Sequence, residues 1–161
     1  MRLFSLGLML ILVACGFHLR GNQGNNTIRY HNLYINCNSN NIEVCSLLKN
    51  TISNQNLTNL ANNQADADYI LEITDIHFKK DSMGLNEYGR ISSYKLTYQA
   101  IIKVFNKKSV QVLDNRLVSY SQLMNYNDSL VLSAQSQEQK TWSEIYLTIV
   151  DLILHNLTIR Q

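Results

Sequence analysis

The residues that could do chemistry in this sequence are few and lie far apart. The cysteines and histidines are Cys15, Cys37, Cys45, His18, His31, His77 and His155. No two histidines have the helical spacing of a zinc site, and the sequence has neither a nucleophile elbow nor a phosphate-binding glycine loop. Asp66 and Asp68 form an Asp-x-Asp pair where a loop should enter a strand, and aspartate is common in such turns. We therefore expect no enzyme, no cofactor and no metal site.

An apolar run, LFSLGLMLILV, precedes Cys15 and follows a single basic residue. A bilayer-spanning helix takes about 20 apolar residues, so this run is too short to cross a membrane and has the length of a signal peptide's apolar region. The alternative is a buried core strand or helix, but the flanks lack the cap or polar alternation of such an element. We interpret residues 1–14 as a signal peptide that is cleaved between Ala14 and Cys15.

Residues Leu12 to Cys15, LVAC, resemble the lipobox of bacterial lipoproteins, in which cleavage exposes a cysteine that becomes diacylated. The resemblance implies acyl chains on Cys15. Because each buried CH₂ contributes about 0.8 kcal/mol, two or three chains form an effectively permanent anchor. Residues 15–26 then form a lipidated tether and residues 27–161 a single domain. Gly16 in place of aspartate implies export to the outer membrane.

Cys37 and Cys45 are the other two thiols. In an oxidising periplasm they could form a disulfide, and closing so short a loop contributes about 2.5 kcal/mol through chain entropy. Alternatively, Cys45 is a small core residue on a helix and Cys37 is a thiol in a turn. The sequence leaves both interpretations open.

Apolar periodicity predicts the element order β-α-β-β-β-α. The expected strands span 27–36, 67–80, 91–105 and 110–126. One expected helix follows a cap at Asn40 or Asn41, and the other spans 133–157. We expect a bulge near Thr74 and Asp75, where the apolar positions change face, an interruption of the last strand at 114–116, and a mobile connector at 81–89. The economical fold is α+β, with two helices packed on one face of a four-stranded, mostly antiparallel sheet.

Alternation is clearest in the strand 91–105. Its even-numbered residues from Tyr94 to Val104 are mostly apolar, and lysine, threonine and glutamine lie between them. In the strand 110–126 the even positions, from Val110 to Tyr126, are expected to share one face. The pattern predicts a sheet with one buried face and one more polar face.

Residues Cys15 to Gly21, CGFHLRG, resemble the start of the mature LptE lipoproteins of Gram-negative bacteria. The runs YKLTYQAIIKVFNKK and EQKTWSEIYLTIVDLILHNL resemble the hairpin and last helix of the same family. The sequence departs from the family at Ser121, where many relatives carry arginine.

The resemblance implies an LptE-like fold and a non-enzymatic lipoprotein on the periplasmic side of the outer membrane. Such a protein plugs an LptD-like β-barrel, assists the assembly of that barrel and helps to insert lipopolysaccharide into the outer leaflet. The alternative is a periplasmic lipoprotein subunit of an ABC-type envelope transport system. The formal net charge of +2 gives no support for binding nucleic acid.

Basic residues occur near the ends of the expected strands. Lys79, Lys80, Arg90 and Lys95 are the candidates for binding the phosphates of lipopolysaccharide, because lysine and arginine form charge-assisted hydrogen bonds with phosphate. The alternative is that they keep loops soluble and protect sheet edges.

Overall fold

The computed structural model describes residues 28–37, 41–127 and 131–158. Its elements are β1 (Leu33–Asn36), α2 (Ile42–Asn54), β2 (Tyr69–Leu85), β3 (Ile91–Asn106), β4 (Gln111–Asn125) and α3 (Val131–Leu157). The expected order β-α-β-β-β-α is thus confirmed. The proposed signal peptide, Cys15 and the tether lie outside the described residues.

The four strands form one sheet in the order β1-β2-β3-β4. β1 runs parallel to β2, whereas β2, β3 and β4 are joined by hairpins and run antiparallel. At both hairpin turns an asparagine side chain accepts two backbone N–H groups: Asn86 from Tyr88 and Arg90, and Asn106 from Lys108 and Val110. These asparagines hold the corners of the long strands in place.

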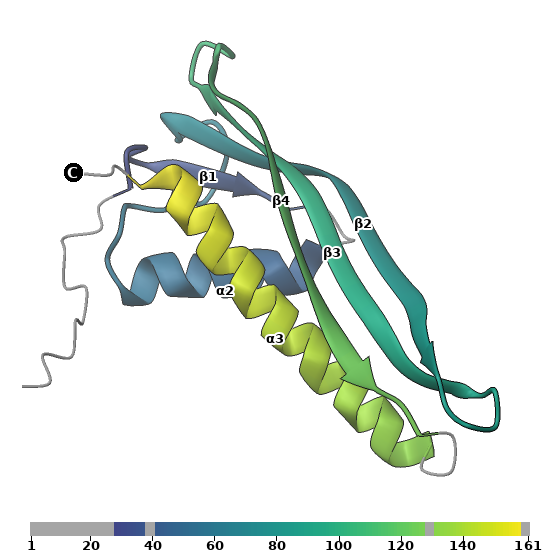
Figure 1. Cartoon of the computed structure of the whole chain (residues 1–161). Coiled ribbons are helices and arrows are strands. Elements are labelled where there is room, and N and C mark those ends of the chain that lie inside the picture. The colour runs from purple at the N-terminus through teal and green to yellow at the C-terminus, as the bar shows by residue number, and fades with distance from the viewer. Residues whose placement is uncertain (1–27, 38–40, 128–130, 159–161) are drawn as a thin grey trace, which may run out of the picture.

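Both helices lie on the same face of the sheet, as expected, and α3 runs diagonally beneath β3 and β4 (Figure 1). The fully buried side chains between the layers include Leu33, Leu48, Ile52, Leu71, Leu96, Ile102, Ile145, Ile149 and Ile153. α2 packs against only part of α3, so the far half of the β2–β3 hairpin has α3 alone beneath it (Figure 1). The sheet is therefore buried on one face and open on the other.

The strand bounds differ from the expected ones at two places. The first strand begins at Leu33 rather than at 27, because Asn32 has a left-handed backbone with φ of 52°. The prediction of a mobile connector at 81–89 is wrong for its first half, because β2 continues to Leu85 and still pairs with β3 there, with register shifts between Ser82 and Gly84 and between Gly84 and Leu85. Long hairpin pairing extends a strand through residues whose own sequence favours a loop.

Two bulges decide which residues face the helices. The expected bulge in β2 is confirmed, with a register shift between Thr74 and His77 and a φ of 51° at Asp75. In β4 the expected interruption is a bulge within a continuous strand, since Arg116 lies opposite Ile102 but Leu113 lies opposite Val104.

The prediction that the even positions of β4 share one face is therefore wrong before this bulge. Val118 and Met124 are buried, whereas Val110 and Val112 are 55% and 40% exposed and Leu113 packs against the core instead. The extra residue rotates the strand, so the side chains before it point to the opposite face.

Candidate binding surface

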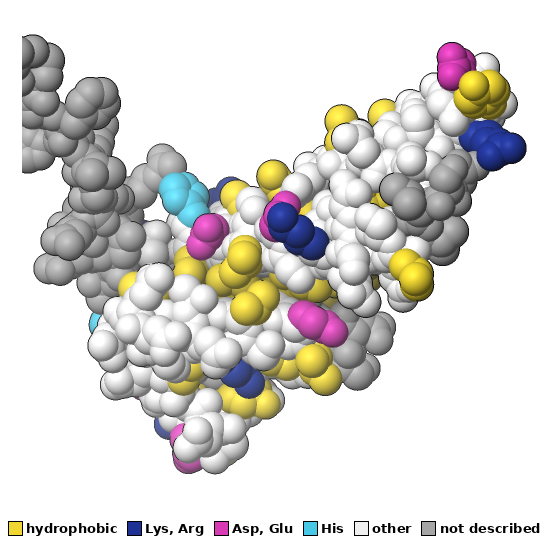
Figure 2. Space-filling view, turned by 90° about the horizontal axis from the view of Figure 1, so that it is seen from below, with side chains coloured by type: hydrophobic (Ala, Val, Ile, Leu, Met, Phe, Trp, Pro, Cys, Tyr) yellow, Lys and Arg dark blue, Asp and Glu magenta, His cyan; other side chains and the backbone are white. Residues whose placement is uncertain are grey.

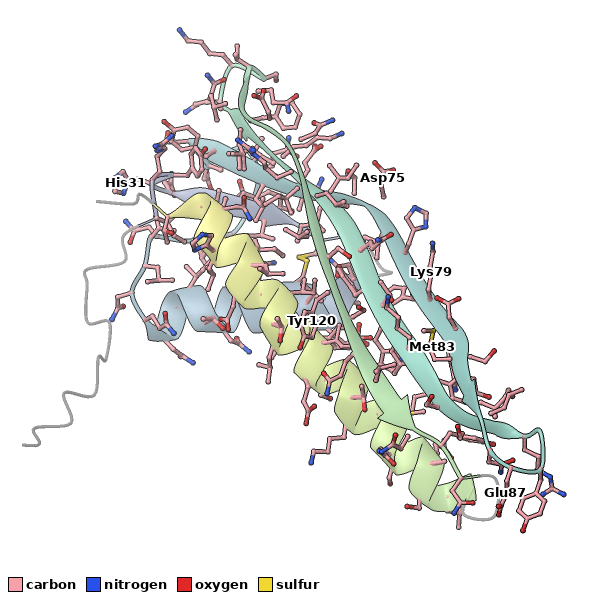
Figure 3. All side chains as sticks on the ribbon, viewed as in Figure 1. His31, Asp75, Lys79, Met83, Glu87 and Tyr120 are labelled. Carbon is pink, nitrogen blue, oxygen red and sulfur yellow. A yellow bond between two sulfur atoms is a disulfide. The ribbon has the colours of Figure 1, made fainter. Side chains whose placement is uncertain are left out.

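The side of the sheet without helices is called here the open face. In an antiparallel pair, directly opposite residues point to the same face, so the register identifies its members. They are Ile70, Glu72, Thr74, His77, Lys79, Asp81, Lys95, Thr97, Gln99, Ile101, Lys103, Leu117, Ser119, Ser121 and Leu123. Figure 3 shows Asp75 and Lys79 pointing away from the helices.

The open face mixes charge, hydroxyl groups and isolated apolar side chains. Glu72 lies opposite Lys103 and Asp81 opposite Lys95, so charges of opposite sign face each other across neighbouring strands. Figure 2, which views the molecule from below, shows acidic and basic side chains scattered among polar and hydrophobic ones on that side too. Such a surface is nearly neutral and can form many weak polar contacts with an extended wall.

The four candidate phosphate-binding residues do not form one cluster. Lys79 and Lys95 are diagonal neighbours on the open face, since Lys79 lies opposite Thr97. Lys80 points to the helix side, where its Nζ donates to Glu138 on α3 and lies 4.6 Å from the centre of the Tyr94 ring. Arg90 lies in the turn at the tip of the β2–β3 hairpin.

An aromatic cluster on the helix side was missed by the sequence analysis. The Phe78 ring lies 5.2 Å from Tyr98 and 5.7 Å from Trp142, and Trp142 lies 6.1 Å from Tyr146. Phe78 is 45% exposed, so the cluster reaches the surface where α2 no longer covers β2. The bulge expected near Asp75 could have indicated this cluster. One extra residue there moves the even-numbered side chains that follow in β2 to the helix side.

Tyr98 and Asn41 join the sheet to the start of α2. The Tyr98 hydroxyl donates to the side-chain oxygen of Asn41 over 2.7 Å, and both residues are buried. Asn41 does precede α2, as expected, but its side chain makes no capping hydrogen bond to the helix. Burial raises the pKa of Tyr98 far above 10.0, and the nearby Tyr146 raises it further, so the phenol keeps its proton and remains a donor.

Cys37 and Cys45 are joined by a disulfide, with their Cα atoms 6.0 Å apart. The bridge links the residue after β1 to the first turns of α2, whose Cys45 side chain is buried. Asp66 and Asp68, the Asp-x-Asp pair, lie in the loop before β2. There the side-chain amide of Asn32 donates to the backbone oxygen of Asp66 over 2.7 Å. Within the described ranges, no three histidine, cysteine or acidic side chains are grouped so that they could hold a metal ion.

Among the described helices, none combines the length and the apolar character needed to cross a membrane. Solved structures that resemble this fold include several bacterial lipoproteins. Lipoprotein B from Nitrosomonas europaea has a TM-score of 0.68 at 20% identity, over 86% of this chain and 88% of that one. A minor lipoprotein from Acinetobacter baumannii has a TM-score of 0.68 at 14% identity, over 83% and 99%.

Rare lipoprotein B from Shewanella oneidensis has a TM-score of 0.64 at 14% identity, over 76% of this chain and 90% of that one. At these identities the likeness establishes the fold, with its two helices on one face of a four-stranded mixed sheet. No curated protein sequence matches the chain. The model of the family LptE, described as lipopolysaccharide-assembly, matches residues 30–157, which include every helix and strand described above. On this match, the chain belongs to the LptE family of lipopolysaccharide-assembly lipoproteins.

Proposed function

We propose that this protein is an outer-membrane lipoprotein, anchored on the periplasmic side by acyl chains on Cys15, that plugs an LptD-like β-barrel in the lipopolysaccharide translocon. There it assists assembly of the barrel and insertion of lipopolysaccharide into the outer leaflet. Membership of the LptE family supports a role in lipopolysaccharide assembly. The observation that carries the more specific role is the open face of the sheet.

The open face has the chemistry that a barrel lumen requires. The interior of a large transmembrane barrel is polar, so a protein seated in it needs a polar surface without an excess of one charge. On the open face, the opposite charges within the Glu72–Lys103 pair and within the Asp81–Lys95 pair cancel. Serine and threonine side chains lie among them. The helix-covered face holds the core, so the open face can lie against a partner without disturbing the fold.

Lipopolysaccharide contact is assigned to Lys79 and Lys95. They are diagonal neighbours on the open face, close enough for one phosphate group to approach both ammonium groups. Lys80 is the weaker candidate, because its ammonium group is already held by Glu138 and the Tyr94 ring. Arg90, at the hairpin tip, would meet a phosphate only beyond the end of the sheet.

The partner is tested by purifying the tagged, full-length lipoprotein from membranes in detergent. We expect a large heat-modifiable β-barrel and lipopolysaccharide to co-purify. Co-purification of an inner-membrane ATPase without the barrel would contradict the plug role and support the ABC-type alternative.

The lipopolysaccharide site is tested with the double variant Lys79→Glu and Lys95→Glu. We expect it to carry several-fold less lipopolysaccharide per co-purified barrel, because phosphate is repelled by carboxylate. The matched control is Lys107→Glu with Lys108→Glu, in the exposed turn between β3 and β4. An equal loss in both double variants would contradict the site and indicate a general effect of charge.

The anchor is tested by mass spectrometry of the mature amino terminus. We expect a thioether-linked diacylglyceryl group on Cys15 and no residue before it. The Cys15→Ala variant should lack the lipid and leave the membrane fraction. An unmodified chain that begins at Met1 would contradict the anchor.

A further inference from the structure

A cavity of about 490 Å³ lies between the end of α2 and the outer edge of β1. Its volume falls within the range of small-molecule sites in proteins. The residues that line it are Ile35, Lys49, Ser53, Asn56, Thr58, Asn59, Leu60, Ala61 and Asn62. None of them belongs to the open face or to the aromatic cluster, so the cavity is separate from the surfaces described above.

The walls of the cavity are held by the backbone. The chain that leaves α2 turns back toward β1 (Figure 1). There the Leu33 N–H donates to the backbone oxygen of Asn59 over 2.8 Å, and the Ala61 N–H donates to the backbone oxygen of Leu33 over 3.0 Å. The Thr58 hydroxyl donates to the backbone oxygen of Tyr30 over 3.0 Å. These contacts preorganise the loop after α2, so a ligand would not have to order it.

Most polar side chains in the lining have no partner within the protein. No described residue forms a hydrogen bond or an ion pair with the side chains of Lys49, Ser53, Asn56, Asn59 and Asn62. Elsewhere in the chain, asparagine side chains hold turns together, as Asn86 and Asn106 do at the two hairpins. The cavity therefore presents ammonium, hydroxyl and amide groups that are available to a ligand.

The chemistry of these groups indicates a class of ligand. Among the described lining residues Lys49 alone is charged, so the site suits one negative charge. An amide side chain both donates and accepts hydrogen bonds, which matches the neighbouring hydroxyl groups of a sugar. Ile35 and Leu60 add the apolar contacts that the C–H face of a sugar ring can use.

Other classes of ligand fit this cavity less well. The lining residues that the structure describes include no carboxylate to bind a cation and no aromatic ring on which a nucleobase could stack. The carbonyl end of a helix repels anions. Here, however, the N–H groups of Gln55, Asn56 and Leu57 already bond carbonyls of the last turn of α2, so this repulsion is reduced.

We propose that this cavity binds a small anionic sugar, a single monosaccharide unit that carries one carboxylate or phosphate group. Lys49 pairs with the anionic group, and the side chains of Ser53, Asn59 and Asn62 bind the ring hydroxyls. This inference does not depend on the proposed function, because the cavity lies on the helix-covered side of the sheet and the open face takes no part in it.

The class of ligand is tested by titrating the full-length lipoprotein in detergent with glucuronate and with glucose 6-phosphate, followed by saturation-transfer NMR of the sugars. We expect saturable binding of both. Neutral glucose, acetate and inorganic phosphate should bind about tenfold more weakly, because each lacks either the charge or the hydroxyl groups. Equal binding of glucose or inorganic phosphate, or no saturable binding of the two anionic sugars, would overturn the proposal.

The position of the anionic group is tested by removing one positive charge at a time. Lys49→Gln should weaken the binding of glucuronate about tenfold, because the charge-assisted hydrogen bond is lost. Lys140→Gln is the matched control, since Lys140 is an exposed helix residue of α3 outside the cavity, and it should leave the binding unchanged. An unchanged affinity in Lys49→Gln, or equal losses in the two variants, would overturn the proposal.

The contacts with the hydroxyl groups are tested with a pair of double variants. Asn59→Ala with Asn62→Ala should weaken the binding of both anionic sugars several-fold. Asn50→Ala with Asn54→Ala, on α2 outside the cavity, should not weaken it. All four asparagines are exposed, so both double variants should fold as the unmodified protein does, which thermal melts check. Equal affinities of the two double variants would contradict the assigned contacts.

Discussion

The helix-covered and open faces of the sheet use alternate residues of the same strands for different purposes. Along β3, Leu96, Ala100 and Ile102 are fully buried under the helices. Their neighbours Lys95 and Lys103 lie on the open face opposite acidic residues of β2. One strand therefore carries both the stability of the fold and its candidate binding surface, and adjacent substitutions should have separable effects.

The largest separation is expected between two neighbours in β3. Ile102→Ala removes a fully buried side chain and should lower the free energy of unfolding by about 3 kcal/mol, because it leaves a cavity in the core between the sheet and the helices. Lys103→Ala, on the open face, should change it by less than about 0.5 kcal/mol. Chemical denaturation measures both values. Equal losses would show that the open face is also part of the core.

The disulfide provides the next largest effect. Cys37 and Cys45 are separated by 8 residues, and the double variant Cys37→Ser and Cys45→Ala should lose about 2.5 kcal/mol of stability through the freed chain entropy. A reducing agent should lower the melting temperature of the unmodified protein and leave that of the variant unchanged. If the reducing agent affected both proteins alike, the bridge would not be the cause.

Tyr98→Phe, on the helix-covered face, should lower the stability by less than the loss of the disulfide does. The variant keeps the ring in its aromatic cluster but leaves the buried oxygen of Asn41 without its donor, at a cost of about 1–2 kcal/mol. Tyr120→Phe is the control, because Tyr120 is a partly buried ring of the same size on β4. Denaturation curves that shift equally for both variants would show that the Asn41 contact is not special.

Alkaline pH should weaken the helix-covered face gradually. The pKa of Tyr98 is raised by burial, so the folded state holds its proton after the unfolded chain, with a pKa near 10.0, has begun to release it. Stability is fully present below pH 10 and should fall above it by about 1 kcal/mol per pH unit. Burial also raises the pKa values of Tyr30 and Tyr146, which add to the slope. Thermal melts of Tyr98→Phe should show a shallower decline, and an unchanged slope would contradict this cause.

The smallest effect on stability is expected for the exposed leucines of the open face. Leu117→Ser and Leu123→Ser remove side chains that are 67% and 64% exposed, so each should change the free energy of unfolding by less than about 0.5 kcal/mol. Chemical denaturation measures both changes. A large loss of stability would mean that these leucines belong to the fold.

Several features could be predicted from short stretches of sequence. The alternation from Tyr94 to Val104 gave the buried face of β3, and the helical period in the last quarter of the chain gave α3. The bulge near Asp75 was visible because the apolar positions change parity there. The family could be identified from the sequence, and the family match confirms it.

Other features could not be predicted because they depend on partners distant in the chain. Lys79 and Lys80 are adjacent in sequence, yet only the register with β3 places Lys79 on the open face and Lys80 beside Glu138. The partner of Asn41 is Tyr98, which lies 57 residues away. The length of β2 likewise follows from pairing with β3 rather than from its own residues.

The sequence by itself determined the elements, their order and the apolar stripe of each, because side-chain direction repeats every two residues in a strand and every 3.6 in a helix. Only the tertiary structure decided which of the basic and aromatic side chains meet, because a single extra residue in a bulge moves every following side chain to the opposite face. The position of a bulge relative to the neighbouring strand is a property of the paired strands, and no single segment contains it.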